Sequence, residues 1–393
     1  MPSRYLFRRL VILLAVFSFF ILCFIHTNLH PITNKNIILY EGSIFTFLAF
    51  FFVIKGRAAP LILFLVLLSY FACLWLVRGH MNLQDFRNII IILFFYYFGN
   101  STKDTSVLRR VFKTATIVIL IVGLLEYFLT DSYLKYINIR DFYMFRGGMS
   151  HLSDYLDQNV FTSAIRPDGR HIMPFLGNLR VSSIFLEPIS MGNFTVILTI
   201  WGIIQCDDNI KKGLIPLVFA FIFLIGCDSR FALVMSGIII AVRFVPILQN
   251  KIILMLLPIA VSITLMTQAY LFNIFKRSDD FQGRLTVSGQ SLLDMNFLEM
   301  IGMSANRNLG DMGIAYSIEH YGIFLCIFLW GLFISIPTPN IQSKRMKAMV
   351  AFYIMGILAV SGTSVYSLKT SSILWFMVGS LTVHASSLQS ESV

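Results

Sequence analysis

The amino-acid sequence predicts an all-α protein that crosses a membrane many times, and two observations lead to this prediction. Of the 393 residues, 57% are hydrophobic and 13% are charged, whereas a soluble domain carries about 25% charged residues. The apolar residues also form long runs, and a run of roughly 17 to 25 residues lets a helix cross a bilayer. A membrane β-barrel is excluded, because its strands are short and alternate apolar with polar residues.

The first predicted element follows a basic N-terminal end. The chain begins MPSRYLFRRLVILLAVFSFFILCFI, which resembles a signal peptide. No small-residue cleavage site follows, because the next residues are HTNLHP. We therefore expect an uncleaved first helix with its basic end in the cytoplasm.

Apolar runs predict about twelve membrane spans along the chain. They are expected at residues 10–26, 37–54, 59–77, 87–99, 111–129, 188–205, 214–227, 231–248, 252–275, 314–336, 346–361 and 370–384. An even number of spans places both termini on one side of the membrane. With the N-terminus in the cytoplasm, the cytoplasmic segments carry most of the lysine and arginine, as the positive-inside rule requires. The short outer loops then hold only Lys35, Arg78, Arg87, Arg230 and Lys369.

Two long connections interrupt this single integral membrane domain of residues 1–393, and both are expected on the outer side of the membrane. They cover residues 130–187 and 276–313 and mix charged, glycine and aromatic residues. Long loops in a protein with otherwise short connections are usually functional. In the first loop, DFYMF and HLSDYLDQNVF predict short helices near the membrane interface.

Several classes of function are excluded by composition and motifs. The net charge of +11 does not indicate nucleic-acid binding, because the basic residues lie mostly at helix ends, where the orientation rule explains them. The five cysteines lack metal-binding spacing. No DxD, HExxH, Walker or GxSxG motif is present, so the sequence offers no support for nucleotide-driven or hydrolase chemistry.

The segment RVSSIFLEP, residues 180–188, places charges at a predicted membrane surface. Glu187 precedes Pro188, and because proline favours the first helical turn, we expect a helix to start at Pro188 with Glu187 just outside. A carboxylate there is favoured by the helix dipole. Glu187 is therefore either a capping carboxylate or one that faces a ligand or positions a base.

Other ionisable residues at predicted helix edges are also candidates. Arg230, in CDSRF between two apolar runs, must reach the surface, pair, or meet an anion, since a charge at bilayer depth costs about 2.5–3.5 kcal/mol. In the second long loop, Arg284 is a further candidate. Asp311 is either a helix N-cap or functional, and His320 is either a packed side chain or a contact to substrate. Because arginine binds phosphate through two parallel hydrogen bonds, Arg180, Arg230 and Arg284 together indicate a lipid-linked diphosphate.

Two acidic residues, Glu41 and Glu126, lie within apolar runs. Intramembrane acids are functional candidates by default. The alternative is that they pair with an arginine such as Arg87.

Three stretches together resemble the Wzy-type polymerases of bacterial surface polysaccharides, which are relatives of the O-antigen ligases. They are RVSSIFLEPISMGNF, CDSRFALVM, and GRLTVSG followed by GDMGIAYSIEHYGI. The resemblance implies a GT-C-like glycosyltransferase of the inner membrane that joins repeat units carried on undecaprenyl diphosphate. It also implies no cofactor and no metal. The expected partners are lipid-linked glycans, membrane lipids and a chain-length regulator protein, with no nucleic acid.

The resemblance also implies roles for particular residues. Arg180, Arg230 and Arg284 would hold the diphosphate, and Glu187 or Asp311 would accept a proton from the attacking sugar hydroxyl. Ligases of this superfamily often carry a histidine near the position of Asp311, which this sequence lacks.

Two other functions remain open at this stage. One is an O-antigen ligase, which would share the arginines and use a different acceptor. The other is a flippase or transporter of lipid-linked oligosaccharide, for which Glu41 and Glu126 are possible proton-coupling sites. The two long outer loops argue against a carrier.

Overall fold

The described part of the chain is all-α, as predicted. The computed structural model describes residues 2–102, 105–146, 160–165, 172, 177–272, 281–304, 309, 312–360 and 362–383. Within these ranges the regular structure is helical, apart from one isolated antiparallel bridge between Ile165 and Leu179. The chain divides into two compact units, each assembled from three separate stretches of sequence.

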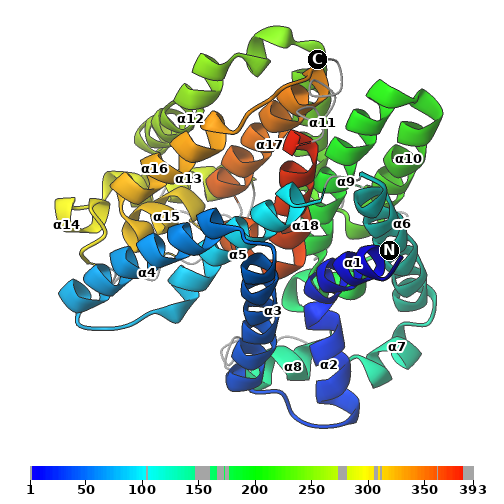
Figure 1. Cartoon of the computed structure of the whole chain (residues 1–393). Helices are drawn as coiled ribbons and strands as arrows, with labels where there is room; N and C mark the ends of the chain where they lie inside the picture. The colour runs from blue at the N-terminus through cyan, green and yellow to red at the C-terminus, as the bar shows by residue number, and fades with distance from the viewer. Residues whose placement is uncertain are drawn as a thin grey trace. The chain divides into compact units, whose positions relative to one another are not determined.

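The first unit consists of Met1–Lys55, Asp104–Leu233 and Leu368–Leu374. Its helices are α1 (Pro2–Val16), α2 (Ser18–Asn28), α3 (Asn34–Ile54), α6 (Thr105–Phe128), α7 (Thr130–Tyr136), α8 (Ile139–Phe145), the 3-10 turn η4 (Ser183–Phe185), α9 (Pro188–Asp208), α10 (Ile210–Cys227) and the first residues of α11 (Arg230–Phe244) and α18 (Leu368–Val383). Helices α9 and α10 run side by side (Figure 1). Their close approach needs glycine, because a Cβ on Gly213 would overlap the backbone carbonyl of Gly202.

The second unit consists of Gly56–Lys103, Val234–Ser367 and Trp375–Val393. It contains the remainder of α11 and α18 together with α4 (Ala58–Arg78), α5 (Leu83–Asn100), η5 (Pro246–Gln249), α12 (Lys251–Phe272), α13 (Phe281–Leu293), α14 (Phe297–Met300), α15 (Gly313–Tyr321), α16 (Ile323–Ser335), α17 (Ile341–Val360) and η6 (Gly362–Tyr366). Helix α13 packs against α12.

Within the described ranges, six helices are long and apolar enough to cross a membrane: α3, α4, α6, α9, α10 and α12. The number rises to eight if each of two bent pairs is one span. These pairs are α1 with α2, bent by 65°, and α15 with α16, bent by 110°. The chain is therefore a membrane protein with several candidate spans.

The predicted number of twelve spans is not confirmed. Within the described residues every predicted run contains a helix or a bent pair, but α5, α11, α17 and α18 are not among the helices long and apolar enough to cross a membrane. Helices α11 and α18 contain 15 and 16 residues and are short for a bilayer. Helices α5 and α17 begin with the polar sequences LQDFRN and IQSKRMK, which shorten their apolar parts.

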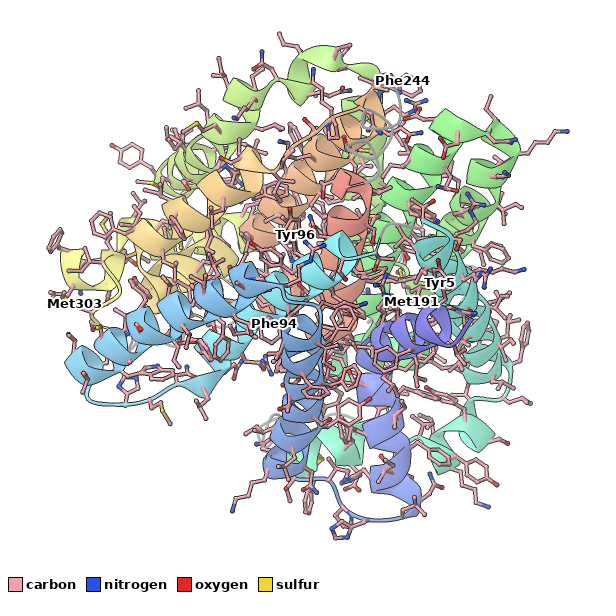
Figure 2. The ribbon with its side chains drawn as sticks, in the orientation of Figure 1. Tyr5, Phe94, Tyr96, Met191, Phe244 and Met303 are labelled. Atoms are coloured by element: carbon pink, nitrogen blue, oxygen red, sulfur yellow. The ribbon has the colours of Figure 1, made fainter. Side chains whose placement is uncertain are left out.

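The candidate spans present apolar side chains outward, as lipid contact requires. Leu76 on α4 is 83% exposed, and large apolar residues such as Phe50 on α3 and Phe221 on α10 are also exposed. Figure 2 shows side chains standing outward along the helices, with exposed Phe244 labelled at the end of α11. Helix α9 is the exception, because it is buried along nearly its whole length.

The two segments predicted as long loops contain helices. DFYMF lies in α8, as predicted, whereas most of HLSDYLDQNVF lies outside the described residues. The segment 276–313 contains α13 and α14. Helix α13 was not predicted because FQGRLTVSGQSLL is rich in glycine, serine and threonine. These small residues allow it to approach α12 closely: a Cβ on Gly289 would overlap the carbonyl oxygen of Leu265.

Candidate functional site

Helix α9 begins at Pro188, as predicted, with Glu187 in the extended conformation just before it. The Glu187 side chain makes no capping hydrogen bond to the helix. Instead its Oε1 accepts a hydrogen bond from Tyr143 Oη at 2.5 Å, and its Oε2 accepts from Ser190 Oγ at 2.6 Å and Lys369 Nζ at 2.8 Å. The carboxylate is thus held by other side chains, and does not act as a hydrogen-bonding cap.

Lys369, the second residue of α18, is the functional candidate that sequence reasoning missed. Its ammonium lies 2.8 Å from Glu187 and also donates to the carbonyl of Phe185 at 3.0 Å. It lies 5.0 Å from the ring centroid of Phe19, within cation–π range. In the sequence it was only one of the outer-loop basic residues, and no local pattern links it to a residue 182 positions earlier.

The turn that leads to Glu187 contains two residues in the left-handed region. Ser183 has φ 51° and Leu186 has φ 62°, and a non-glycine residue there costs on the order of 1–3 kcal/mol. Such conformations persist only where the surroundings hold them, and they concentrate at functional sites. The position of Glu187 is therefore determined by a strained turn as well as by its own hydrogen bonds.

Glu126 on α6 holds this turn. Its Oε2 accepts from the backbone N–H groups of Ser182 at 2.9 Å and Ser183 at 2.5 Å. The Ser183 hydroxyl donates to the carbonyl of Ile119, also on α6, at 2.7 Å. The sequence predicted that Glu126 is either a functional acid or the partner of an arginine. Among the described residues, its carboxylate instead accepts hydrogen bonds from backbone amides. Glu126 fixes the loop that carries Glu187.

Replacing Glu126 by leucine is expected to destabilise the protein, because two buried backbone amides lose their acceptor. Each orphaned donor costs about 1–3 kcal/mol. Glu126→Gln retains one carbonyl oxygen and should cost less. The measurement is the free energy of unfolding in detergent micelles for both variants, and equal stabilities of the two variants would contradict this role.

Arg180 is buried, and its guanidinium group donates hydrogen bonds to backbone carbonyls. Its Nε donates to the carbonyl of Cys227 and its Nη1 to the carbonyl of Ser163, both at 2.9 Å. The adjacent Val181 N–H donates to the carbonyl of Gly226 at 2.9 Å. Arg180 therefore ties the segment before Glu187 to the C-terminal end of α10, and its expected contact with a diphosphate stays a prediction.

The other predicted site residues are distributed over both units. Arg230 is exposed and begins α11, directly after the turn at Asp228. Arg284 is half-buried on α13 in the second unit. His320 lies in the last turn of α15, also in the second unit, with its Nδ1 2.9 Å from Asp85 Oδ2. Asp311 lies outside the described residues. The first unit thus brings Arg180 and Glu187 into one segment.

The electrostatic surroundings keep Glu187 ionised. Burial alone would raise the pKa of its carboxyl, but the Lys369 ammonium and the hydrogen bonds from Lys369, Ser190 and Tyr143 together lower the pKa below its ordinary value of 4.5. Burial and the neighbouring carboxylate in turn raise the pKa of Tyr143 well above its ordinary value, so Tyr143 remains a hydrogen-bond donor.

This lowered pKa predicts a specific dependence of stability on pH. A carboxyl with a lower pKa in the folded protein stabilises the fold above its unfolded pKa, and this contribution is lost as the pH falls through the folded pKa. The difference in unfolding free energy between wild type and Glu187→Gln should therefore be largest near neutral pH and shrink below pH 4.5. Unfolding of both proteins in detergent between neutral and acidic pH measures it. A difference that stays constant would exclude the ion pair as its source.

Among the described residues, no group of three or more histidine, cysteine, aspartate and glutamate side chains is arranged to hold a metal ion. The arrangement around Glu187 can instead present a fixed negative charge to a ligand. In comparisons with known proteins, the chain matches no family model, no curated protein and no solved structure at a significant level.

Proposed function

We propose that this protein is a membrane glycosyltransferase that polymerises oligosaccharide repeat units carried on undecaprenyl diphosphate. The proposed site of action is the periplasmic face of the bacterial inner membrane, and the product is a surface polysaccharide. The energy for each transfer resides in the sugar–diphosphate bond, so no nucleotide is needed.

The observation that carries the proposal is the Glu187 carboxylate, held by Lys369, Ser190 and Tyr143 directly before a buried apolar helix. A buried ion pair is weak evidence for stability, because well-packed apolar residues often do as well or better. Retaining this pair on a strained turn is better explained by a ligand. The turn lies inside RVSSIFLEPISMGNF, one of the stretches that resemble the Wzy-type polymerases.

The lowered pKa narrows the role that we assign to Glu187. A general base works best when its pKa lies near the operating pH, so a strongly ionised, triply hydrogen-bonded carboxylate is a weak base. It is better suited to orienting a sugar hydroxyl or to stabilising positive charge at the anomeric carbon as the diphosphate leaves. We assign Glu187 this electrostatic role in the proposed reaction.

In the proposal, an arginine side chain binds the diphosphate of the substrate. Arg180 donates to backbone carbonyls, so we assign the diphosphate chiefly to Arg230, which belongs to the same unit as Glu187. Two parallel hydrogen bonds from a guanidinium to phosphate oxygens would stabilise the charge that builds on the leaving group.

Glycan profiling of a deletion strain tests the proposed function. The strain is complemented with wild type, with Arg230→Ala or with Lys135→Ala, which removes an exposed cation on α7. Surface glycan is resolved by size on a gel, and protein amounts are compared by immunoblot. We expect single repeats in the deletion strain and a ladder restored by wild type and Lys135→Ala, but not by Arg230→Ala.

The same experiment separates the alternative functions. Normal-length polymer that accumulates on its lipid carrier would indicate a ligase. Single repeats that accumulate on the cytoplasmic side would indicate a flippase. A normal surface polymer in the deletion strain would remove the protein from polymerisation altogether.

A further inference from the structure

Three helix ends meet around a buried carboxylate in the second unit. Asp85 lies in the first turn of α5, His320 in the last turn of α15, and Arg78 is the last residue of α4. Asp85 Oδ2 is 2.9 Å from His320 Nδ1 and 3.7 Å from Arg78 Nη1, and its Oδ1 accepts from Tyr316 Oη at 3.1 Å. Asp85 is fully buried. No sequence motif singled it out.

The positions on these helices explain why the charges are stable there. A carboxylate is favoured at a helix N-terminus and a cation at a C-terminus. Asp85, in the first turn of α5, and Arg78, at the end of α4, satisfy both rules. Arg78 also donates through Nη2 to the last carbonyls of α15, those of Glu319 at 3.0 Å and His320 at 2.9 Å. The C-terminal end of α15 is thus tied to the end of α4.

One ring nitrogen of His320, Nε2, has no hydrogen-bond partner among the described residues. An ionised carboxylate only accepts hydrogen bonds, so Nδ1 must donate and carry a proton. In the neutral ring the lone pair then lies on Nε2, which makes no hydrogen bond to any described residue. The ring is stacked on Tyr316, with centroids 4.0 Å apart and an interplanar angle of 23°, and the side chain is 13% exposed. The contact with Asp85 and the stacking on Tyr316 therefore fix the orientation of the imidazole.

We propose that Asp85 and His320 form an acid–base dyad in which His320 Nε2 accepts the proton and Asp85 is the positioning residue. This inference rests on the proposed function. Other titratable side chains also face this cluster, and they include Arg78, Arg87, Glu319, Tyr70, Tyr316, Tyr321 and Tyr366.

The step assigned to the dyad is the activation of the acceptor sugar. The acceptor O–H gives its proton to Nε2 as its oxygen forms a bond to the anomeric carbon of the donor sugar. The bond between that carbon and the diphosphate oxygen breaks, and its electron pair stays on the diphosphate. The imidazolium is stabilised by Asp85 and later returns its proton to water, which restores the neutral ring.

The dyad geometry can be tested without measuring activity. Full-length protein labelled with ¹⁵N-histidine is placed in lipid bilayers and studied by solid-state NMR at neutral pH, with His320 assigned by comparison with His320→Gln. We expect a protonated Nδ1 and an unprotonated Nε2. In Asp85→Asn, the amide N–H group can donate to Nδ1, so the tautomer should reverse. A protonated Nε2 in the wild type, or no change in Asp85→Asn, would overturn the dyad.

The role in the reaction is tested with purified protein and a lipid-linked repeat unit as substrate. His320→Gln and Asp85→Asn should lower kcat by about 10²–10⁴-fold with little change in KM, as loss of a general base does. His30→Gln, at an exposed histidine, should match the wild type. Tyr316→Phe removes only a donor to Asp85 and should have a smaller effect.

The two proposals fail in different ways in this assay. If the wild type extends the substrate and folded His320→Gln keeps a rate within a few-fold of it, the dyad is wrong and the polymerase function stands. If the wild type does not extend the substrate, the proposed function fails, and the tautomer measurement alone then decides whether the dyad exists.

Discussion

Replacing Lys369 by methionine is expected to lower the free energy of unfolding by about 2–4 kcal/mol. Removing one partner of a buried ion pair leaves the other charge without compensation, which costs roughly 3–5 kcal/mol for fully buried pairs. The lower range reflects Glu187, whose side chain is 24% exposed, whereas that of Lys369 is 4% exposed. Unfolding in mixed micelles, followed by tryptophan fluorescence, gives the value.

A double variant separates the lost charge from lost packing. In Lys369→Met combined with Glu187→Gln, no unpaired charge remains, so much of the stability should return. Lys135→Met, at an exposed lysine on α7, should change stability by less than about 0.5 kcal/mol. If the double variant is as unstable as Lys369→Met alone, the ion pair is not the cause.

Replacing Glu187 by glutamine is expected to lower the rate of glycan transfer by about 10²–10³-fold. This is the typical loss when one fixed electrostatic group at a reacting centre is removed. The amide keeps the shape and still accepts a hydrogen bond from Ser190 or Tyr143, but Lys369 loses its counter-charge, so rates are compared for folded protein only. Extension of a lipid-linked repeat unit by purified protein measures the rate.

Asp131→Asn is the matched control for this variant, because Asp131 is an exposed carboxylate in the first turn of α7. It should transfer glycan at the wild-type rate. If Glu187→Gln were equally active, Glu187 would have a structural role only. The recovery of stability in the double variant should not bring back activity, since the negative charge is still missing.

The sequence allowed the fold class and the helix positions to be predicted because both depend on local apolar runs. The start of α9 was also predictable, since Pro188 restricts the residue before it and favours a first helical turn. The number of membrane spans could not be predicted in the same way. A bend such as that between α15 and α16 depends on Gly322, which has φ 75°, and on contacts that no local pattern reveals. Helix α13 depends on small residues facing α12.

The residues around Glu187 were predictable only in part. Glu187 stood out as a charge at the edge of an apolar run, and Glu126 as an acid within one. Their partners come from distant positions: Lys369 lies 182 residues from Glu187, and Ser182 lies 56 residues from Glu126. Asp85 was not predicted because an acid in the first turn of a helix is ordinary in sequence. Only the tertiary structure places it beside His320.

The pairing of Glu187 with Lys369 has a consequence for the order of synthesis. Ribosomes add about 5–20 residues per second, so roughly 10–40 s pass between the two residues. During that interval the turn before α9 carries a carboxylate without its cation. A chain that ends before α18 would keep the charge of Glu187 uncompensated, which would destabilise the turn before α9.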